Sequence, residues 1–273
     1  MFVFVPEGTD EKTALERTTH LAISAHQDDI EIMAYDGIVK CFGSAEHHFT
    51  GVVVTNGSGS PRSGIYAGYT DEEMREIRKK EQCKAAVVGE YSAQVFLDYT
   101  SGDVKNPRGA EVVNALKEVI ERTKPRYIYT HNLADKHDTH VGVAVKVIQA
   151  LRALRYVPDG VYGCEVWRSL DWLSDGDKVT FDVAGHANLE AAVLGVFDSQ
   201  IAGGKRYDLA TVGRRLANAT YFESHGVDGT ASLMYAMDLT PLARDAGANL
   251  AEYVLAYIGD FAKDVERKIG GLL

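Results

Sequence analysis

The chain has 273 residues, of which 45% are hydrophobic and 25% charged, so it can bury an ordinary core and is not a disordered protein. Its 29 Lys and Arg against 39 Asp and Glu give a net charge of -10, which argues against nucleic acid and anionic membranes as partners. No stretch approaches the roughly 20 apolar residues that span a bilayer, and the N-terminus lacks the basic flank of a secretory signal. Its three widely spaced cysteines favour reduced thiols and a cytoplasmic location.

The first half of the chain alternates between two periodicities. Short apolar or β-branched runs predict strands at residues 21–25, 49–55, 93–97 and 127–130. Apolar residues at helical spacing predict helices at residues 30–42, 70–88, 110–122 and 141–154. The helix that begins at Thr70 has the clearest boundaries, because Thr70 and Glu73 form a capping-box pattern and Gly89 stands just past its end.

Strands separated by helices indicate βαβ units, and therefore an α/β fold with a mostly parallel sheet covered by helices on both faces. The second half is less regular. It offers further strands at 161–167 and 178–183 and helices at 188–198, 207–221 and 248–268. No Pro-rich or Ser-rich linker divides the chain, so we expect one domain over residues 1–273. Within this domain, residues 1–155 form the part that carries the candidate metal site. Residues 156–273 add extra strands and helices as walls of the site or as an interface.

Histidines and aspartates gather where the predicted strands hand over to helices. The group comprises His26, Asp28, Asp29, His131, His137 and His140. Parallel sheets place their sites at the carboxyl ends of strands, so these side chains can meet there. Paired carboxylates beside a histidine need a cation when they lie near an apolar strand, and zinc accepts both imidazole nitrogen and carboxylate oxygen. The pattern predicts a metal site with surplus groups left for proton transfer.

The strongest of these motifs has a counterpart in a known family. The segment Ala25-His26-Gln27-Asp28-Asp29-Ile30-Glu31 resembles the Ala-His-x-Asp-Asp signature of the PIG-L/LmbE-like zinc deacetylases. Its continuation is similar to the bacillithiol-biosynthesis type. Over about the first 155 residues, three further segments agree in order: Thr55-Asn56-Gly57, the Arg-x-x-Glu of Arg78 to Glu81, and Asp135-Lys136-His137-Asp138-Thr139-His140. A weaker echo is Asp198-Ser199-Gln200, which resembles a Ser-Gln pair of the family.

The resemblance implies a Rossmann-like fold and zinc-dependent removal of an N-acetyl group, a linear amide, from a GlcNAc-type amino sugar. The roles it implies are zinc ligation by His26, Asp29 and His140, general-base catalysis by Asp28, stabilisation of the oxyanion or protonation of the leaving amine by His137, and sugar binding by Arg78. Zinc would polarise the amide and its attacking water. Asp98, at another strand end, is a further candidate for substrate binding, with a role in the turn as the competing interpretation.

Two departures from the family pattern bear on these roles. Gln27 stands where the family usually has proline, which is a mild change. Thr139 stands where the family has an aspartate that orients a histidine, so the support of His137 is open, with Asp135 as a substitute. The predicted metal is Zn²⁺, or another divalent ion such as Fe²⁺.

Several alternatives remain beside the deacetylase hypothesis. The chain could be a zinc amidase of a larger sugar or thiol conjugate, or a degenerate, non-catalytic sugar-binding homologue. A dinucleotide enzyme is disfavoured, because no Gly-x-Gly-x-x-Gly follows the first predicted strand and carboxylates there would repel a pyrophosphate. The expected partner is a small-molecule amino-sugar conjugate, and a homo-oligomer is left open.

Overall fold

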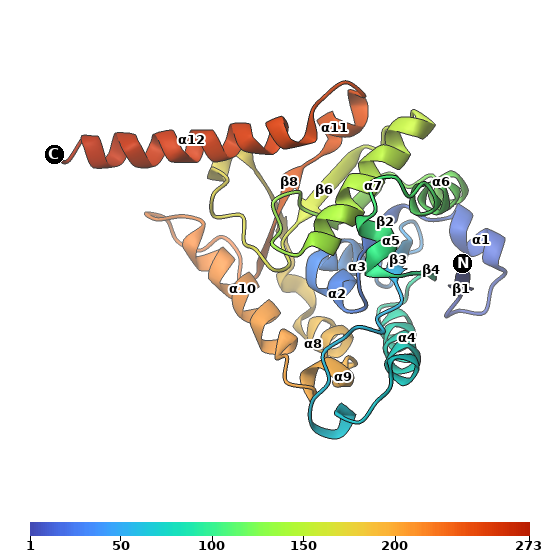
Figure 1. The fold of residues 1–273 in the computed structure, drawn as a ribbon. Helices are drawn as coiled ribbons and strands as arrows, with labels where there is room; N and C mark the ends of the chain where they lie inside the picture. The colour runs from blue at the N-terminus through green and yellow to red at the C-terminus, as the bar shows by residue number, and fades with distance from the viewer.

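The computed structural model describes residues 1–273 and contains one eight-stranded sheet in the order β1-β4-β3-β2-β5-β6-β8-β7 (Figure 1). The strands are β1 (Phe2–Phe4), β2 (His20–Ser24), β3 (Phe49–Thr55), β4 (Ala93–Tyr99), β5 (Tyr127–His131), β6 (Gly160–Cys164), β7 (Lys178–Asp182) and β8 (Leu233–Asp238). The five strands from β4 to β6 pair in parallel, whereas β1, β8 and β7 join antiparallel. The predicted α/β fold with a mostly parallel sheet is therefore confirmed.

Twelve α-helices surround this sheet. They are α1 (Glu11–Glu16), α2 (Asp29–Met33), α3 (Tyr35–Cys41), α4 (Asp71–Val88), α5 (Ser101–Lys105), α6 (Glu111–Thr123), α7 (Asp138–Leu154), α8 (Ala187–Gly195), α9 (Asp198–Ile201), α10 (Tyr207–Tyr221), α11 (Thr240–Arg244) and α12 (Leu250–Gly270). Short 3-10 turns lie at Gly64–Tyr66, Asp175–Asp177 and Ala184–His186.

Two apolar cores form on opposite faces of the sheet, because successive side chains of a strand point to opposite sides. In β2, Leu21 and Ile23 belong to one core and Ala22 to the other. The first core is covered by α1, α6, α7, α11 and the start of α12, and the second by α2, α3, α4 and α8. Burial on both faces explains why these strands read as continuous apolar runs in the sequence.

Helix α4 begins and ends where the sequence predicts. The hydroxyl of Thr70 accepts the Glu73 backbone N–H, the Glu73 carboxylate accepts the Thr70 N–H, and Gly89 is the C-cap. The helix predicted at 30–42 is instead two helices, α2 and α3, broken at Ala34, whose φ of -121° leaves the helical region. Hydrophobic periodicity could not reveal this break, because the apolar side chains on both sides of it are buried.

The less regular second half extends the same sheet through β6, β8 and β7. Strand β8, which carries the run Leu-Met-Tyr-Ala-Met-Asp, was not predicted, because it lacks the β-branched residues that mark strands. Helix α12 packs through Val254 and then projects from the body, where Phe261 and Ile269 are exposed (Figure 1). None of the helices has both the length and the apolar character needed to cross a membrane.

His20, buried at the start of β2, gives a test of the fold that does not involve the candidate site. Burial, helped by the nearby charge of Lys40, lowers the pKa of His20 to about 4. Between pH 6.5 and 4 the unfolded chain therefore binds a proton that the folded chain does not, and stability falls as the pH falls. Between pH 6.5 and 4, the buried neutral ring of His20 should lower the free energy of unfolding by about 3 kcal/mol.

The measurement is the free energy of unfolding against pH in urea. His20→Phe should flatten the curve between pH 6.5 and 4 relative to the parent, whatever its absolute stability. His225→Phe, at an exposed histidine, should leave the slope unchanged. Equal slopes for the parent and His20→Phe would show that His20 is not held neutral in the fold.

Candidate active site

The turn from β2 into α2, at the carboxyl end of a central strand, carries three of the predicted site residues. Asp28 has a φ of 79°, a left-handed conformation that is uncommon outside glycine. Asp29 is the first residue of α2, and its Oδ2 accepts the backbone N–H of His26 at 2.8 Å. The two aspartates are buried and His26 is partly buried. The turn thus aims neighbouring carboxylates in different directions.

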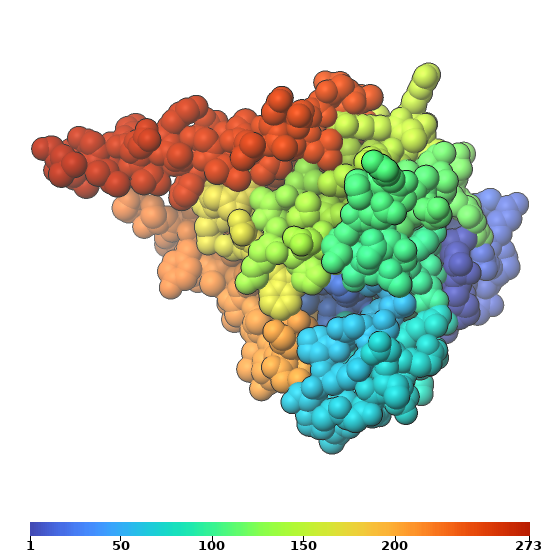
Figure 2. Space-filling model, in the orientation of Figure 1, coloured from blue at the N-terminus to red at the C-terminus, as the bar shows by residue number.

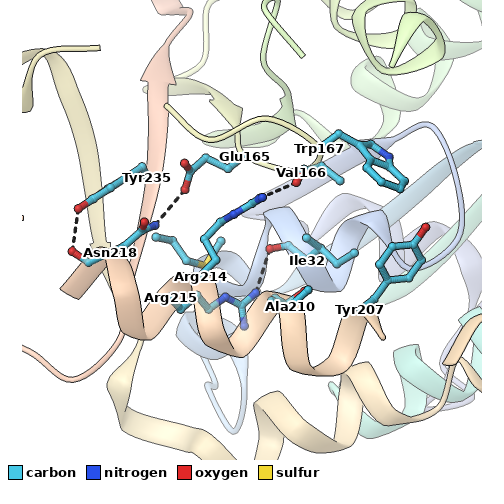
Figure 3. A pocket seen from close by; sticks show the side chains of 12 residues that line it. Ile32, Glu165, Val166, Trp167, Tyr207, Ala210, Arg214, Arg215, Asn218 and Tyr235 are labelled. Atoms are coloured by element: carbon cyan, nitrogen blue, oxygen red, sulfur yellow. Dashed lines mark hydrogen bonds between the residues drawn. The ribbon is translucent and has the colours of Figure 1, made fainter. Parts of the chain in front are cut away.

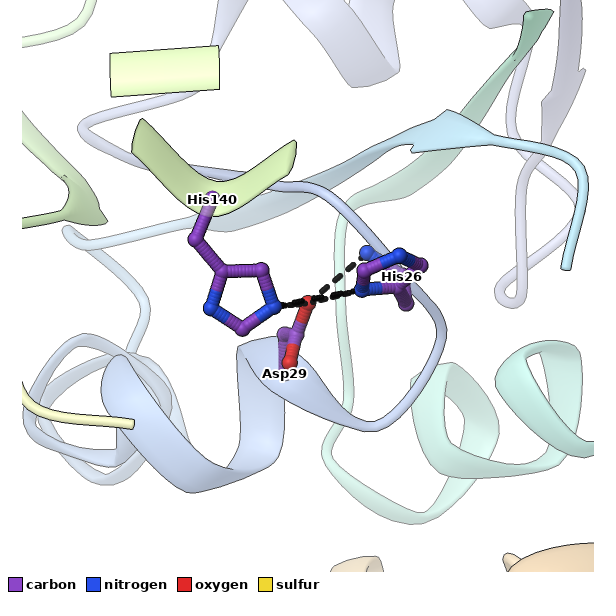
Figure 4. A group of neighbouring side chains, drawn as sticks. All are labelled: His26, Asp29 and His140. Atoms are coloured by element: carbon purple, nitrogen blue, oxygen red, sulfur yellow. Dashed lines mark hydrogen bonds and ion pairs between the residues drawn. The ribbon is translucent and has the colours of Figure 1, made fainter. Parts of the chain in front are cut away.

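His140, in the first turn of α7, meets this turn from the other side (Figure 4). The Nδ1 of His26 lies 3.2 Å from Asp29 Oδ2 and 3.2 Å from the Nε2 of His140. The remaining edge, from His140 Nε2 to Asp29 Oδ2, is 3.3 Å. Bonds of about 2.0–2.2 Å at tetrahedral angles place the ligand atoms of zinc roughly 3.3 Å apart. The donor atoms and their spacing therefore fit a tetrahedral divalent metal.

The charges around His140 also suit a cation. Burial would lower the pKa of His140, but Asp29 and Asp135 together raise it to about 9. Asp135 Oδ2 lies 3.6 Å from the Nδ1 of His140, on the side of the ring away from Asp29. Outer carboxylates of this kind fix the orientation of a metal-binding histidine and increase its basicity. Asp135 thus supports His140, and not the ring of His137 as the sequence suggested.

His131 lies beside this group without joining it. Its ring is buried and stacks on His140 with 3.9 Å between ring centroids. Its Nε2 accepts the backbone N–H of Ala25 at 2.8 Å, so the lone pair that a metal would need is already used. The structure therefore favours a structural role for His131 over metal ligation.

His137 is the N-cap of α7, and its Nδ1 accepts the backbone N–H of Thr139 at 3.3 Å. A neutral ring that accepts through Nδ1 carries its hydrogen on Nε2, which leaves Nε2–H free to donate. The ring lines the same cleft as His26, with 5.0 Å between the two ring centroids. Because a backbone N–H supports the ring, its placement does not depend on an aspartate at position 139.

Asp28 points to Arg78, which α4 places on the opposite wall. Both terminal nitrogens of Arg78 lie 3.2 Å from Asp28 Oδ2, and one also donates to the carbonyl of Gln27. Burial, with a smaller contribution from the charge of Asp29, raises the pKa of Asp28 to about 7 against the opposing charge of Arg78. Arg78 is itself buried, so its placement indicates a residue that positions Asp28 more than a free sugar contact.

These side chains open onto a cleft with a volume of about 500 Å³. Figure 2 shows it as a hollow, with blue N-terminal residues on its floor between cyan, green and yellow segments. Its walls include the loop 55–61, the turn 100–102, and Trp167, Lys205 and Tyr207 from the second half. Sequence reasoning did not identify Trp167 or Tyr207 as site residues. Lys205 stands next to Arg206 in the sequence, and this small basic pair is the only local feature that marks it.

The structure does not bring Asp98 to this cleft, in contrast to our expectation. Asp98 adopts a left-handed φ of 67° at the end of β4, and its carboxylate pairs with Arg75 on the surface. It borders a different, smaller depression. The rule that sites lie at the carboxyl ends of parallel strands predicts at which edge of the sheet a residue lies. It does not predict the direction in which the side chain leaves the strand. The competing interpretation, a role in the turn, is the one that the geometry favours.

Two of the weaker motifs have a structural explanation. Glu81, three residues after Arg78, accepts the backbone N–H of Ser199 at 2.7 Å and its hydroxyl at 2.6 Å. This contact ties α9 to α4 and sets Gln200 in the wall of the cleft. Gly57 has a φ of 74°, and a Cβ there would lie 2.4 Å from the side-chain oxygen of Gln27. The Thr-Asn-Gly turn therefore requires glycine at its third position.

Comparison with known proteins gives this geometry its context. Residues 21–151 match the family model described as PIG-L, GlcNAc-PI de-N-acetylase. Residues 21–151 belong to the PIG-L family. Every predicted site residue lies inside this PIG-L segment, whereas Trp167, Lys205 and Tyr207 lie outside it. The family is one of deacetylases, and no curated protein matches the chain.

Solved structures share the fold of most of the chain. A40926 pseudoaglycone deacetylase Dbv21 aligns with a TM-score of 0.60 at 16% identity, covering 81% of this chain and 97% of that one. The N,N'-diacetylchitobiose deacetylase of Pyrococcus horikoshii gives 0.60 at 15% identity, covering 84% and 88%. GalB, the 4-carboxy-2-hydroxymuconate hydratase from Pseudomonas putida, gives 0.60 at 17% identity, covering 81% and 96%. At these identities the likeness concerns the fold, and one of the three proteins is a hydratase.

Proposed function

We propose that this protein removes the N-acetyl group from a GlcNAc-type amino-sugar conjugate, with a divalent metal, Zn²⁺ in the first instance. His26, Asp29 and His140 would hold the metal. The observation that carries the proposal is the triangle of two imidazole nitrogens and one carboxylate oxygen with edges of 3.2 to 3.3 Å. It lies in a cleft that Asp28 and His137 also line. Membership of the PIG-L segment in a deacetylase family supports the same reaction.

A zinc ion held by these residues would supply Lewis-acid polarisation of the amide carbonyl and of the attacking water. Asp28 accepts the proton of that water as it attacks, and Arg78 keeps the carboxylate in position through its two 3.2 Å contacts. His137 donates its Nε2–H to the oxygen on which negative charge develops. Asp28, now protonated, then delivers that proton to the departing amine, while the neutral ring of His137 remains a hydrogen-bond donor.

The substrate class rests on the family and on the shape of the cleft. The cleft has room for a sugar, and Trp167 and Tyr207 offer aromatic faces on one wall. The Pyrococcus horikoshii relative of the same fold is named for diacetylchitobiose, and the Dbv21 relative for a pseudoaglycone. We further propose that residues 1–273 act as one domain, because strands from both halves of the chain pair within a single sheet.

The test is acetate release from N-acetylglucosamine and its methyl and phenyl β-glycosides by the full chain, alongside metal analysis of the purified protein. We expect about one divalent ion per chain and acetate formed in step with free amine. Bound metal without acetate from any of these compounds would contradict deacetylation of simple GlcNAc conjugates and favour an amidase of a larger conjugate. A protein that binds no metal would contradict the hydrolase reading altogether.

A further inference from the structure

A second cavity, which we name the side chamber and which Figure 3 shows from close by, shares part of its lining with the cleft. Its volume is about 180 Å³. Four residues line both spaces and so form the partition between them: Ile32, Val166, Trp167 and Tyr207. The rings of Trp167 and Tyr207 meet edge to face with 5.9 Å between their centroids. Two aromatic rings thus stand between the side chamber and the cleft.

Most polar side chains that line the side chamber already form hydrogen bonds within the protein. The carboxylate of Glu165 accepts the backbone N–H of Leu170 at 2.7 Å and the amide of Asn218 at 3.0 Å. Arg215 pairs with Glu190 and donates to the carbonyl of Ile32. These groups have little hydrogen-bonding capacity left for a ligand. What remains to contact a ligand is mainly apolar, from the aromatic pair, Ile32, Met234 and Ala210.

Arg214 is the exception. Its guanidinium donates to the carbonyl of Val166 and forms no ion pair within 4.0 Å, although the carboxylate of Glu165 is near enough for the two charges to attract each other (Figure 3). The side chain is partly buried, and the guanidinium keeps N–H groups without a protein acceptor. A ligand that filled the chamber would remove water from those N–H groups, which is costly unless the ligand brings an acceptor.

The volume limits what can enter. A dry apolar cavity of about 150 Å³ holds a benzene molecule, so 180 Å³ accommodates one aromatic ring or an acyl chain of about six carbons. Apart from Ile32, the residues that enclose the chamber lie outside the PIG-L segment, on the 165–167 stretch, α10 and β8. The chamber is therefore built by the part of the chain that the family model does not cover.

We propose that the side chamber binds an apolar substituent of the substrate, a ring or short acyl chain, that carries an oxygen acceptor paired with Arg214. The proposal rests on the proposed function, in which the sugar occupies the cleft, and makes the second half of the chain the part that selects the substrate. The substituent can be attached through the glycosidic oxygen or through the acyl group. The two attachments share their chemistry and are separated by the choice of probe.

The experiment compares the methyl, phenyl and 4-carboxyphenyl β-glycosides of N-acetylglucosamine with the methyl glycoside of N-phenylacetylglucosamine. Burial of the ring should raise kcat/KM about tenfold or more over methyl N-acetylglucosaminide, through KM, for either the phenyl glycoside or the N-phenylacetyl compound. The preferred compound shows which attachment reaches the chamber. If the glycoside is preferred, the carboxylate should add a further severalfold gain. No preference for any ring-bearing probe would overturn the proposal.

Two variants on α10 locate the effect. Ala210→Phe places a ring at an exposed position that lines the chamber but not the cleft, and should reduce the ring preference to about one, with the methyl glycoside within twofold of the parent. Leu209→Phe adds the same ring at the neighbouring exposed position, which does not line the chamber, and should keep the preference. Arg214→Met should keep the preference for phenyl but abolish the gain from the carboxylate. A ring preference that survives Ala210→Phe would overturn the proposal.

Calorimetric binding of the same glycosides separates this inference from the proposed function. Tighter binding of phenyl than methyl glycoside by about tenfold, lost in Ala210→Phe, would support the chamber even if no acetate were released. In that outcome the reaction would be wrong and the binding site right. Deacetylation of all glycosides at equal rates and with equal affinities would support the proposed reaction and contradict the side chamber as a binding site.

Discussion

Asp28→Asn should lower kcat by about a hundredfold to ten-thousandfold and leave the metal content unchanged. Asparagine keeps the size of the side chain and an oxygen for Arg78, but it cannot accept the proton of the attacking water. The carboxylate of Asp28 points to Arg78, whereas Asp29 points to His26 and His140, so the two neighbouring aspartates face different partners. Only the proton-transfer step should suffer from this substitution.

The assay measures acetate release and bound metal for the parent and the variant side by side. Asp260→Asn, at an exposed position on the projecting part of α12, is the matched control and should behave as the parent. Metal loss in Asp28→Asn would contradict the assignment, because it would give Asp28 the ligand role and free Asp29 for proton transfer. Full turnover with full metal would exclude Asp28 as the base.

How far the sequence alone predicted this site follows from the topology of the sheet. His26 and His140 are 114 residues apart, yet they meet because β2 and β5 are parallel neighbours and α7 follows β5. Any parallel sheet with this strand order brings those two junctions together. The strand and helix periodicities were strong enough to place both junctions. The triangle of donor atoms is a consequence of that topology together with the composition of the two turns.

The other wall of the cleft could not be predicted in the same way. Trp167 is the last residue of the strand predicted at 161–167 but lies past the end of β6 at Cys164, and Tyr207 is the first residue of α10. Aromatic residues of this kind usually fill a core, and nothing local in the sequence separates a core ring from a ring that lines a cavity. Their position depends on how β6 and β8 add to the sheet, and β8 was missed because its side chains lack the usual strand signature.

The tautomer of His137 shows a different limit. The family pattern assigns its support to an aspartate, and Thr139 stands in that place. The structure replaces the missing carboxylate with the backbone N–H of Thr139 itself, which any residue except proline supplies at that position. A sequence motif records side chains and not backbone groups. The change from aspartate to Thr139 therefore suggested a larger loss of support for His137 than the structure has.

The second large effect is expected at the metal site. His140→Ala removes one of three donor atoms and should abolish both bound metal and acetate release. The buried carboxylate of Asp29 would at the same time lose its nearest imidazole from α7. Asp135→Asn should weaken metal binding only in part. Asparagine keeps an oxygen that accepts the backbone N–H of His137, but it lacks the charge that Asp135 places beside the His140 ring. Loss of such an outer carboxylate costs about 10- to 100-fold in metal affinity.

The measurement is metal content after dialysis against a series of chelator concentrations, followed by activity after zinc is added back. The order of affinity should be parent, then Asp135→Asn, then His140→Ala, and added zinc should restore activity to Asp135→Asn but not to His140→Ala. His225→Ala, at an exposed histidine far along the chain, should match the parent throughout. An His140→Ala protein that keeps its metal would mean that the donor triangle is not the binding site, since the remaining two atoms could not hold the ion alone.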